Sequence, residues 1–263
     1  MFGSLLGSKG SANTDIGEQM LNTVAAQSIR HLFSKSESVE VEIRCYPSSK
    51  LLQGSIDSFK MSGRGLVIRK QFEVETMSFE TDAVALDFGA VLAGKVRLKQ
   101  PTQAVAQVVL SEDGINRAFE AELVRKRLQN VDMELLTNLS GGEPVSFKKV
   151  QVQLLPDNQV KIFAETDLPN RSNVPIRLLA TIVVEKRRRI TFSDAQFEPS
   201  DIPEDMRGLS EALSKAFVEV LNSMVDLDRF DLDGVMLRVN RLETQGQKLI
   251  FSGYAQIDHF PGT

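Results

Sequence analysis

Paired runs of alternating apolar and polar residues dominate this sequence and restrict what it can fold into. Residues 150–154 and 160–164 form one such pair around a turn at 156–158, and residues 176–197 contain a second pair. A two-residue period places the apolar side chains of a strand on one face, and short turns join neighbouring strands into antiparallel hairpins. Because one-sided strands need a second layer over their apolar face, the pattern predicts an antiparallel sheet packed against helices.

Three stretches follow a helical period instead, and each precedes a predicted hairpin. The order helix then hairpin occurs over residues 15–62, 111–166 and 203–257. Two acids follow Ser111 and two follow Pro203. This is typical of a helix start, because a hydroxyl can cap free N–H groups and acids stabilise the positive end of the helix dipole. The recurrence indicates a loose internal repeat.

We therefore predict an α+β fold, in which an elongated, curled antiparallel β-sheet of long hairpins wraps around about three amphipathic helices. Apolar residues make up 42% of the chain and charged residues 25%, which is enough apolar material for a sizeable core. We expect residues 1–13, rich in Gly and Ser, to be a mobile N-terminus. Residues 14–260 should form a single elongated domain of two related halves, with a hinge near 138–144.

One predicted strand changes its apolar phase part-way. Phe72 and Val74 share one phase, whereas Met77 and Phe79 share the other. A β-bulge near 75–76 would accommodate the extra residue and return both pairs to one face.

Composition excludes several classes of protein. A net charge of −4 and a pI near 5.4 argue against general nucleic-acid binding, which needs a basic face. A single cysteine, Cys45, cannot form an internal disulfide and favours a reducing compartment. We find no signal-peptide pattern and no run near the ~18 apolar residues that span a bilayer. We expect a cytoplasmic protein with peripheral contact to a membrane.

The sequence carries no pattern typical of catalysis or metal binding. No G-x-S-x-G nucleophile elbow is present, and His31 and His259 lie in remote segments. Cys45 falls on an apolar strand phase, as a core residue would. The acids between 226 and 233, followed by Gly234, depart from EF-hand spacing. We predict no catalytic residue, no metal site and no cofactor.

The most concentrated charge in the chain has two interpretations. The run lies at a predicted hairpin turn between apolar strands and consists of Lys186, Arg187, Arg188 and Arg189. It can protect a hydrophobic edge from aggregation, or it can contact anionic headgroups at a membrane surface.

The apolar faces of the three helices also have two interpretations. They can close the core over the sheet, or they can line an apolar groove for acyl chains. The predicted lining residues are Leu21, Val24, Ile29, Ile115, Phe119, Leu123, Leu213, Phe217, Val220 and Met224.

The stretch from Lys99 to Asn116, KQPTQAVAQVVLSEDGIN, resembles the signature of the LmeA-like phospholipid-binding family. That signature is a proline-led strand rich in Ala and Val that runs into a Thr/Ser-Glu-x-x-Ile/Leu-Asn helix start. The hairpins at 150–164 and 235–254 are also similar, and a chain without a signal sequence most resembles cyanobacterial members. The resemblance implies a fold akin to tubular lipid-binding proteins, a phospholipid or related amphiphile as ligand, and no catalytic residues.

The sequence thus predicts non-catalytic binding or transfer of a phospholipid in an apolar groove, with an anionic membrane surface as partner and no nucleic acid. The alternative is a structural adaptor that docks to a membrane-associated complex without bound lipid. An enzyme acting on lipids is a third, less supported hypothesis. Stoichiometric lipid in an organic extract of the purified protein distinguishes the first from the second.

Overall fold

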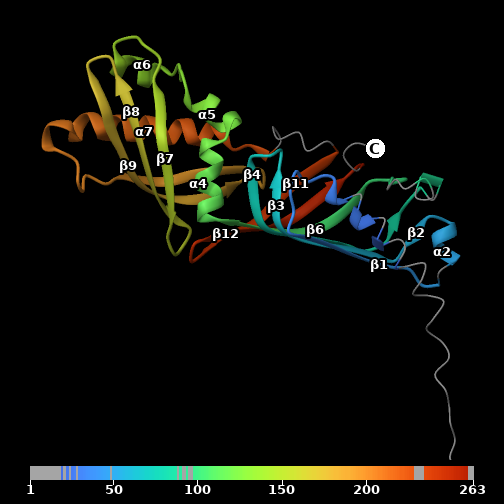
Figure 1. Ribbon diagram of the computed structural model, residues 1–263. Helices are drawn as coiled ribbons and strands as arrows, with labels where there is room; N and C mark the ends of the chain where they lie inside the picture. The colour runs from blue at the N-terminus through green and yellow to red at the C-terminus, as the bar shows by residue number, and fades with distance from the viewer. Residues whose placement is uncertain are drawn as a thin grey trace, which may run out of the picture.

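The computed structural model describes residues 19, 22–23, 25–27, 29–47, 49–87, 89–90, 93, 97–227 and 234–259, except for the side chains of 51 and 52. These residues form an elongated α+β molecule with a sheet at each end and helices between and above them (Figure 1). The predicted fold class, a curled antiparallel sheet with helices, is confirmed, although the strands divide into two large sheets.

The first large sheet has six antiparallel strands in the order β1-β3-β4-β6-β12-β11. Their bounds are β1 Ser38–Arg44, β3 Ser58–Ile68, β4 Phe72–Thr81, β6 Thr102–Ser111, β12 Lys248–Ile257 and β11 Val235–Gln245. A small sheet of β2 (Ser55–Ile56) and β5 (Val84–Ala85), with the short helix α2 (Ser49–Leu52), adjoins its outer end. Residues from both ends of the sequence therefore share this sheet.

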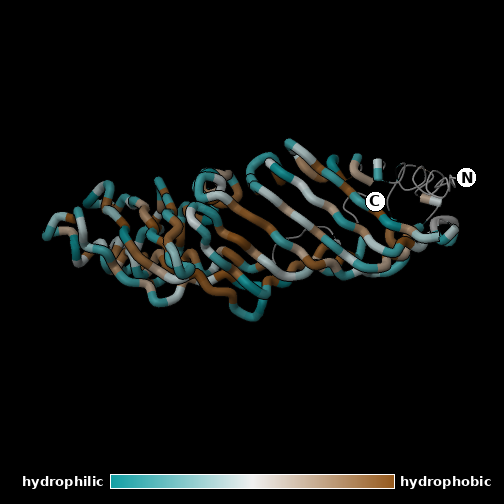
Figure 2. The backbone as a smooth tube through the Cα atoms, turned by 90° about the horizontal axis from the view of Figure 1, so that it is seen from below, coloured by the Kyte–Doolittle hydropathy of each residue, from teal (hydrophilic) through white to brown (hydrophobic). Residues whose placement is uncertain are grey.

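The sheet has a buried inner face and a polar outer face, as the alternation predicts. Along β1, Val39 and Ile43 are buried whereas Glu40 and Glu42 are exposed. The same alternation of hydrophilic and hydrophobic residues is visible along the strands in Figure 2. The described residues between 19 and 30 are helical, and Ile29 packs in the cluster formed by the inner face. Burial of the apolar phase thus fixes which face is inside.

The second large sheet has the order β10-β9-β8-β7, and the long helix α7 packs on it. The strands are β7 Ser146–Leu154, β8 Gln159–Leu168, β9 Arg171–Glu185 and β10 Arg189–Phe197, and α7 is Glu204–Met224. Both predicted hairpins are present here, with turns after Leu154 and Glu185. The largest core cluster fills the space between this sheet and α7.

Three short helices connect the two large sheets: α4 (Glu112–Glu120), α5 (Glu122–Leu128) and α6 (Glu134–Ser140). The predicted start at Ser111 is confirmed, because its hydroxyl accepts a hydrogen bond from the N–H of Gly114 at 3.1 Å. The helical stretch predicted after Ser111 divides into two helices, because the backbone turns at Ala121, with φ −60° and ψ 138°. The break lets Leu128 reach the core, whereas Leu123 is 42% exposed.

The β-bulge predicted near 75–76 is not present in β4, although the apolar residues of this strand do change position in the alternation there. The register between β3 and β4 stays constant from Phe59↔Thr81 to Ile68↔Phe72. Instead, the alternation of buried and exposed residues also shifts by one position in the neighbouring strand β3, between Gly63 and Leu66. Gly65, at this shift, has a φ of +57° that other residues rarely adopt. Because both strands change together, no extra residue is needed.

The chain passes between the two large sheets at Ser111 and again between α7 and β11. Residues 138–144, the predicted hinge, lie at the end of α6 and in the loop that follows, where Gly141 has a left-handed backbone. Flexing at this loop stays a prediction. The predicted N-terminal segment 1–13 lies outside the described residues.

Candidate functional site

The inner face of the six-stranded sheet carries a row of large apolar side chains that are only partly buried. Met77 of β4 lies opposite Val108 of β6, and Val108 lies opposite Phe251 of β12. Directly opposed residues on antiparallel strands point to the same face. All three side chains pack at the margins of core clusters without entering them. The row is therefore an apolar surface that is only partly covered.

Small residues fill the neighbouring rows of the same face, namely Ala104, Ala106, Gly253 and Ala255. Phe79 stands beside them on β4, and Leu98 packs against their far end. Gly253 is needed because a Cβ at this position would lie 1.9 Å from the carbonyl oxygen of Arg238. Ala104, Ala106 and Ala255 are at most 7% exposed, whereas Phe79 and Gly253 are only partly buried. We call this set of residues on the inner face the inner trough: Met77, Phe79, Ala104, Ala106, Val108, Phe251, Gly253 and Ala255.

Helix α4 extends the apolar surface from the inner trough toward the second large sheet. Leu110, at the end of β6, packs against the clusters of both large sheets. Ile115 and Phe119 of α4 are partly buried in the same cluster that Phe251 adjoins. Two of the predicted lining residues therefore lie where the structure brings half-buried apolar side chains together.

The Ser-Glu-x-x-Ile-Asn motif at the start of α4 holds this helix on the edge of the second large sheet. The Asn116 amide accepts from the N–H of Val152 at 2.7 Å and donates to the carbonyl of the same residue at 3.0 Å. The Glu112 carboxylate accepts from the N–H of Leu154 at 2.7 Å. Because β7 is an edge strand, these side chains take the place of a neighbouring strand and protect the edge.

Comparison with models of known protein families shows which family the chain belongs to. A model described as LmeA-like phospholipid-binding matches residues 12–253. The chain belongs to this family. The match covers nearly the whole chain, including α7 and both large sheets up to the middle of β12. No curated protein and no solved structure matches the chain.

The contact that Asn116 makes with an edge strand recurs at two other places in the structure, which the sequence did not reveal. Asn222 of α7 repeats the same contact on β10, the other edge of the sheet. It accepts from the N–H of Phe192 at 2.7 Å and donates to its carbonyl at 3.3 Å. Asn22 likewise accepts from the N–H of Ile43 on the edge strand β1 at 2.7 Å. An apolar-Asn pair in each helical stretch was the available sequence signal.

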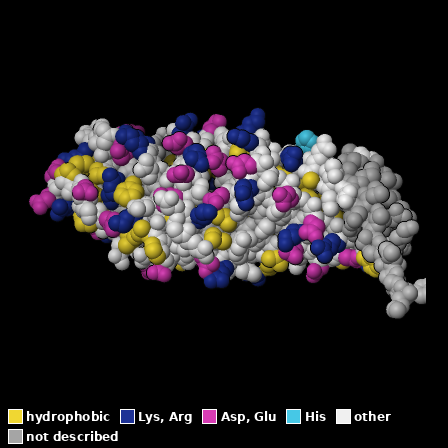
Figure 3. Space-filling view, turned by 60° about the horizontal axis from the view of Figure 1, so that its bottom comes forward, with side chains coloured by type: hydrophobic (Ala, Val, Ile, Leu, Met, Phe, Trp, Pro, Cys, Tyr) yellow, Lys and Arg dark blue, Asp and Glu magenta, His cyan; other side chains and the backbone are white. Residues whose placement is uncertain are grey.

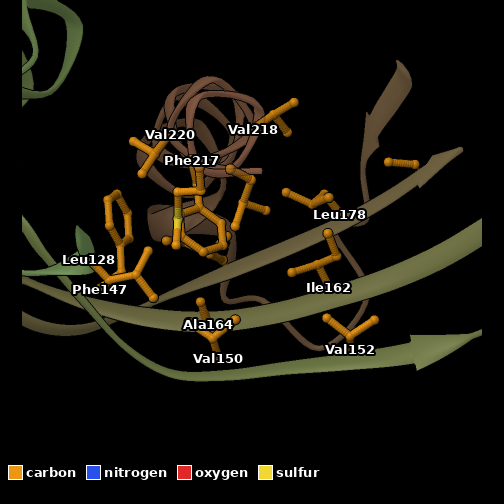
Figure 4. Packing of buried hydrophobic residues seen from close by; sticks show 14 of the residues in the cluster. Leu128, Phe147, Val150, Val152, Ile162, Ala164, Leu178, Phe217, Val218 and Val220 are labelled. Atoms are coloured by element: carbon orange, nitrogen blue, oxygen red, sulfur yellow. The ribbon is translucent and has the colours of Figure 1, made fainter. Parts of the chain in front are cut away.

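The predicted lining residues of α7 lie in the protein's own core. Leu213 and Phe217 are fully buried, Val220 is 2% exposed and Met224 is 8% exposed. The Phe217 ring packs on Phe147 with centroids 4.5 Å apart (Figure 4). A lipid reaches these side chains only if α7 moves away from the sheet. Their contact with lipid stays a prediction.

The remaining predicted lining residues divide between burial and exposure. Ile29 of the first helical stretch is 4% exposed and packs on the inner face of the six-stranded sheet. Leu123 points toward solvent after the break at Ala121. Leu21 and Val24 lie outside the described residues.

The basic turn between β9 and β10 docks on the first large sheet. The guanidinium of Arg187 lies 4.7 Å from the ring centroid of Tyr254 and donates to the side chain of Asn240. The backbone carbonyl of Arg187 accepts a hydrogen bond from the N–H of Val239 at 2.8 Å. Arg189 reaches the carbonyl of Asn222 at 3.4 Å, whereas Lys186 is exposed. Headgroup contact by these three residues and Arg188 stays a prediction.

Two exposed carboxylates have lowered pKa values because each accepts a hydrogen bond from a lysine. The hydrogen bond from Lys50, helped by the N–H of Tyr46, holds the pKa of Asp57 below its usual range. The pKa of Asp167 is lowered in the same way by Lys148. Both pKa values move away from neutrality, opposite to the tuning expected of a catalytic acid. These carboxylates act as partners in exposed ion pairs.

Two surface cavities have charged side chains in their lining. One of about 320 Å³ lies between the β3–β4 hairpin and the segment before β1, where five charged residues mix with Leu66, Val67 and Val74. The other, of about 500 Å³, lies beside Lys148 and Asp167. Burying methylene groups there would desolvate charged side chains, which is costly.

In the part of the chain that the structure describes, no three His, Cys, Asp or Glu side chains come together as metal ligands. Of the predicted acidic stretch, residues 228–233 lie outside the described residues. Among the helices that are described, none combines the length and apolar character needed to cross a bilayer.

Proposed function

We propose that the protein binds a phospholipid without catalysis, with the acyl chains lying along the inner trough, and that it transfers this lipid at a membrane surface. The observation that carries the proposal is the half-buried apolar row of Met77, Val108 and Phe251, in a member of a phospholipid-binding family. Ile115 and Phe119 continue the apolar surface past the end of β6.

The strength of such binding follows from the apolar surface removed from water. Each buried methylene contributes about 0.8 kcal/mol, so ten methylenes against the inner trough contribute roughly 8 kcal/mol before ordering costs. Phe79 and Phe251 are only partly buried and offer contact to an acyl chain, whereas the buried Ala104, Ala106 and Ala255 become accessible to it only if the parts of the chain that cover them move. No covalent step is required to hold the lipid.

Mass spectrometry of an organic extract of the purified protein tests the proposal. We expect about one phospholipid per protein, and we expect Val108→Gln to lose most of it. An amide placed against an acyl chain without a partner costs about 1–3 kcal/mol, which corresponds to a five- to hundredfold weaker affinity.

The matched control is Val109→Gln, because the next residue along β6 points to the outer face and joins none of the core clusters among the described residues. Thermal unfolding of both variants shows whether the fold is kept. Equal lipid content in folded Val108→Gln and wild type would place the lipid elsewhere. A wild-type extract without lipid would favour the structural adaptor.

A further inference from the structure

The outer face of the six-stranded sheet interrupts its polar pattern at one place. A row across the strands runs from Glu80 of β4 to Val105 of β6, then to Tyr254 of β12 and Arg238 of β11. Val105 is 70% exposed although it lies on a central strand, and Met236, in the next row, is 45% exposed. The apolar side chains on this face are therefore gathered over β6, β12 and β11.

The basic turn completes this surface with positive charge. Arg187 stacks on Tyr254, so the turn is fixed beside the exposed apolar residues. Lys186 is the adjacent residue and is exposed. We call this surface the outer patch: Val105, Met236, Tyr254, Arg238, Lys186 and Arg187.

The charge of the outer patch is opposite to that of the whole chain. The outer patch contains three cations, Arg238, Lys186 and Arg187, and no acid, a local net charge of +3, whereas the chain carries −4. Glu80, at the margin of the row, lies 3.6 Å from Lys60 and is balanced by it. Figure 3, which brings the underside forward, shows positive and negative side chains interspersed on the face in view. A cationic surface that also presents apolar side chains complements an anionic bilayer.

We infer that the outer patch is the surface with which this protein docks on an anionic membrane. Val105, Met236 and the Tyr254 ring enter the headgroup region, while Lys186 and Arg238 face the lipid phosphates. Tyr is suited to this boundary because its ring is apolar and its hydroxyl is polar. The inference rests on the proposed function, since a protein that transfers lipid has to reach a bilayer. It assigns that contact to a face opposite the inner trough.

Co-sedimentation with vesicles of equal parts phosphatidylserine and phosphatidylcholine tests the inference. Val105→Gln removes apolar contact without changing charge, and we expect binding to weaken roughly three- to tenfold. Lys186→Gln removes one cation, and we expect about fivefold weaker binding at low salt. The loss for Lys186→Gln should shrink at ionic strengths where charges beyond ~8 Å are screened.

Two control variants match these changes at other places. Leu135 of α6 is 40% exposed, so Leu135→Gln removes a comparable apolar group. Lys70 lies at the β3–β4 turn and, like Lys186, is exposed with a positive φ, so Lys70→Gln removes a comparable cation. Both control variants should sediment like wild type.

Measuring bound lipid in the same samples separates the docking surface from the proposed lipid-binding site. Unchanged lipid content with weaker sedimentation of Val105→Gln and Lys186→Gln supports the inference. Wild-type sedimentation of both, or equal losses in the controls, overturns it. A wild-type protein that ignores vesicles but dissociates from dimer to monomer on Val105→Gln would assign the outer patch to a second copy instead. Absence of lipid from the wild-type extract would refute the proposed function while sedimentation still decides the docking surface.

Discussion

The two hydrogen bonds between Asn116 and Val152 should make a large contribution to the stability of the protein. Asn116→Ala leaves the N–H and the carbonyl of Val152 without their partners. Val152 lies on the edge strand β7 and is only 5% exposed. An unsatisfied buried polar group costs about 1–3 kcal/mol, and partial access of water to the edge reduces this. We expect the free energy of unfolding to fall by roughly 2–4 kcal/mol.

Urea unfolding followed by circular dichroism measures this change. For a protein of this size, each kcal/mol lowers the melting temperature by about 2–4 °C, so a fall of roughly 4–16 °C should accompany it. Asn116→Asp should lie between the wild type and Asn116→Ala, because a carboxylate still accepts from the N–H of Val152 but cannot donate to its carbonyl.

Asn138→Ala is the control for this prediction. Asn138 is exposed on α6, and its replacement should change the free energy of unfolding by less than about 0.5 kcal/mol. If Asn116→Ala were no less stable than Asn138→Ala, the role of the motif in holding α4 on β7 would be wrong.

Two further predictions concern the core and an ion pair. Phe217→Asp places a carboxylate at a fully buried position and should lower the free energy of unfolding by roughly 4 kcal/mol or more. The control Leu123→Asp, at a 42% exposed position, should be tolerated. Melting curves of both variants check this, and a stable Phe217→Asp protein would contradict the packing of α7. The pKa of Asp57 is lowered chiefly by Lys50, so its stabilising contribution is present above the unfolded value of 3.8 and is lost as pH falls through the folded pKa. The stability difference between wild type and Asp57→Asn should therefore vanish in acid, and a difference that persists there would point to another cause.

Local patterns were sufficient to predict the strands, the hairpin turns and the fold class. The alternation along 150–164 and 176–197 yields the hairpins β7–β8 and β9–β10 of the structure. The acids after Ser111 and Pro203 mark the starts of α4 and α7. These features depend on periodicity and on caps, which involve residues only a few positions apart.

The composition of the candidate site required the tertiary structure. The inner trough joins β4, β6 and β12, and β12 follows β6 in the sheet although more than a hundred residues separate them in the sequence. The sequence indicates only that Val108 is an inward-facing residue of a strand, whereas the structure places Met77 and Phe251 on either side of it. Periodicity tells which residues share a face of one strand, but it carries no information on which strand lies next to it.

The sequence by itself determined that the helices have apolar faces and that a basic turn follows β9. Only the tertiary structure decided that Phe217 faces Phe147 in a filled core, that Leu123 faces solvent, and that Arg187 stacks on Tyr254. An apolar helix face lowers the free energy equally well against a sheet or against a lipid, because the hydrophobic effect depends on area removed from water and not on the partner. Which partner each face meets is fixed by the packing of elements that are distant in the sequence.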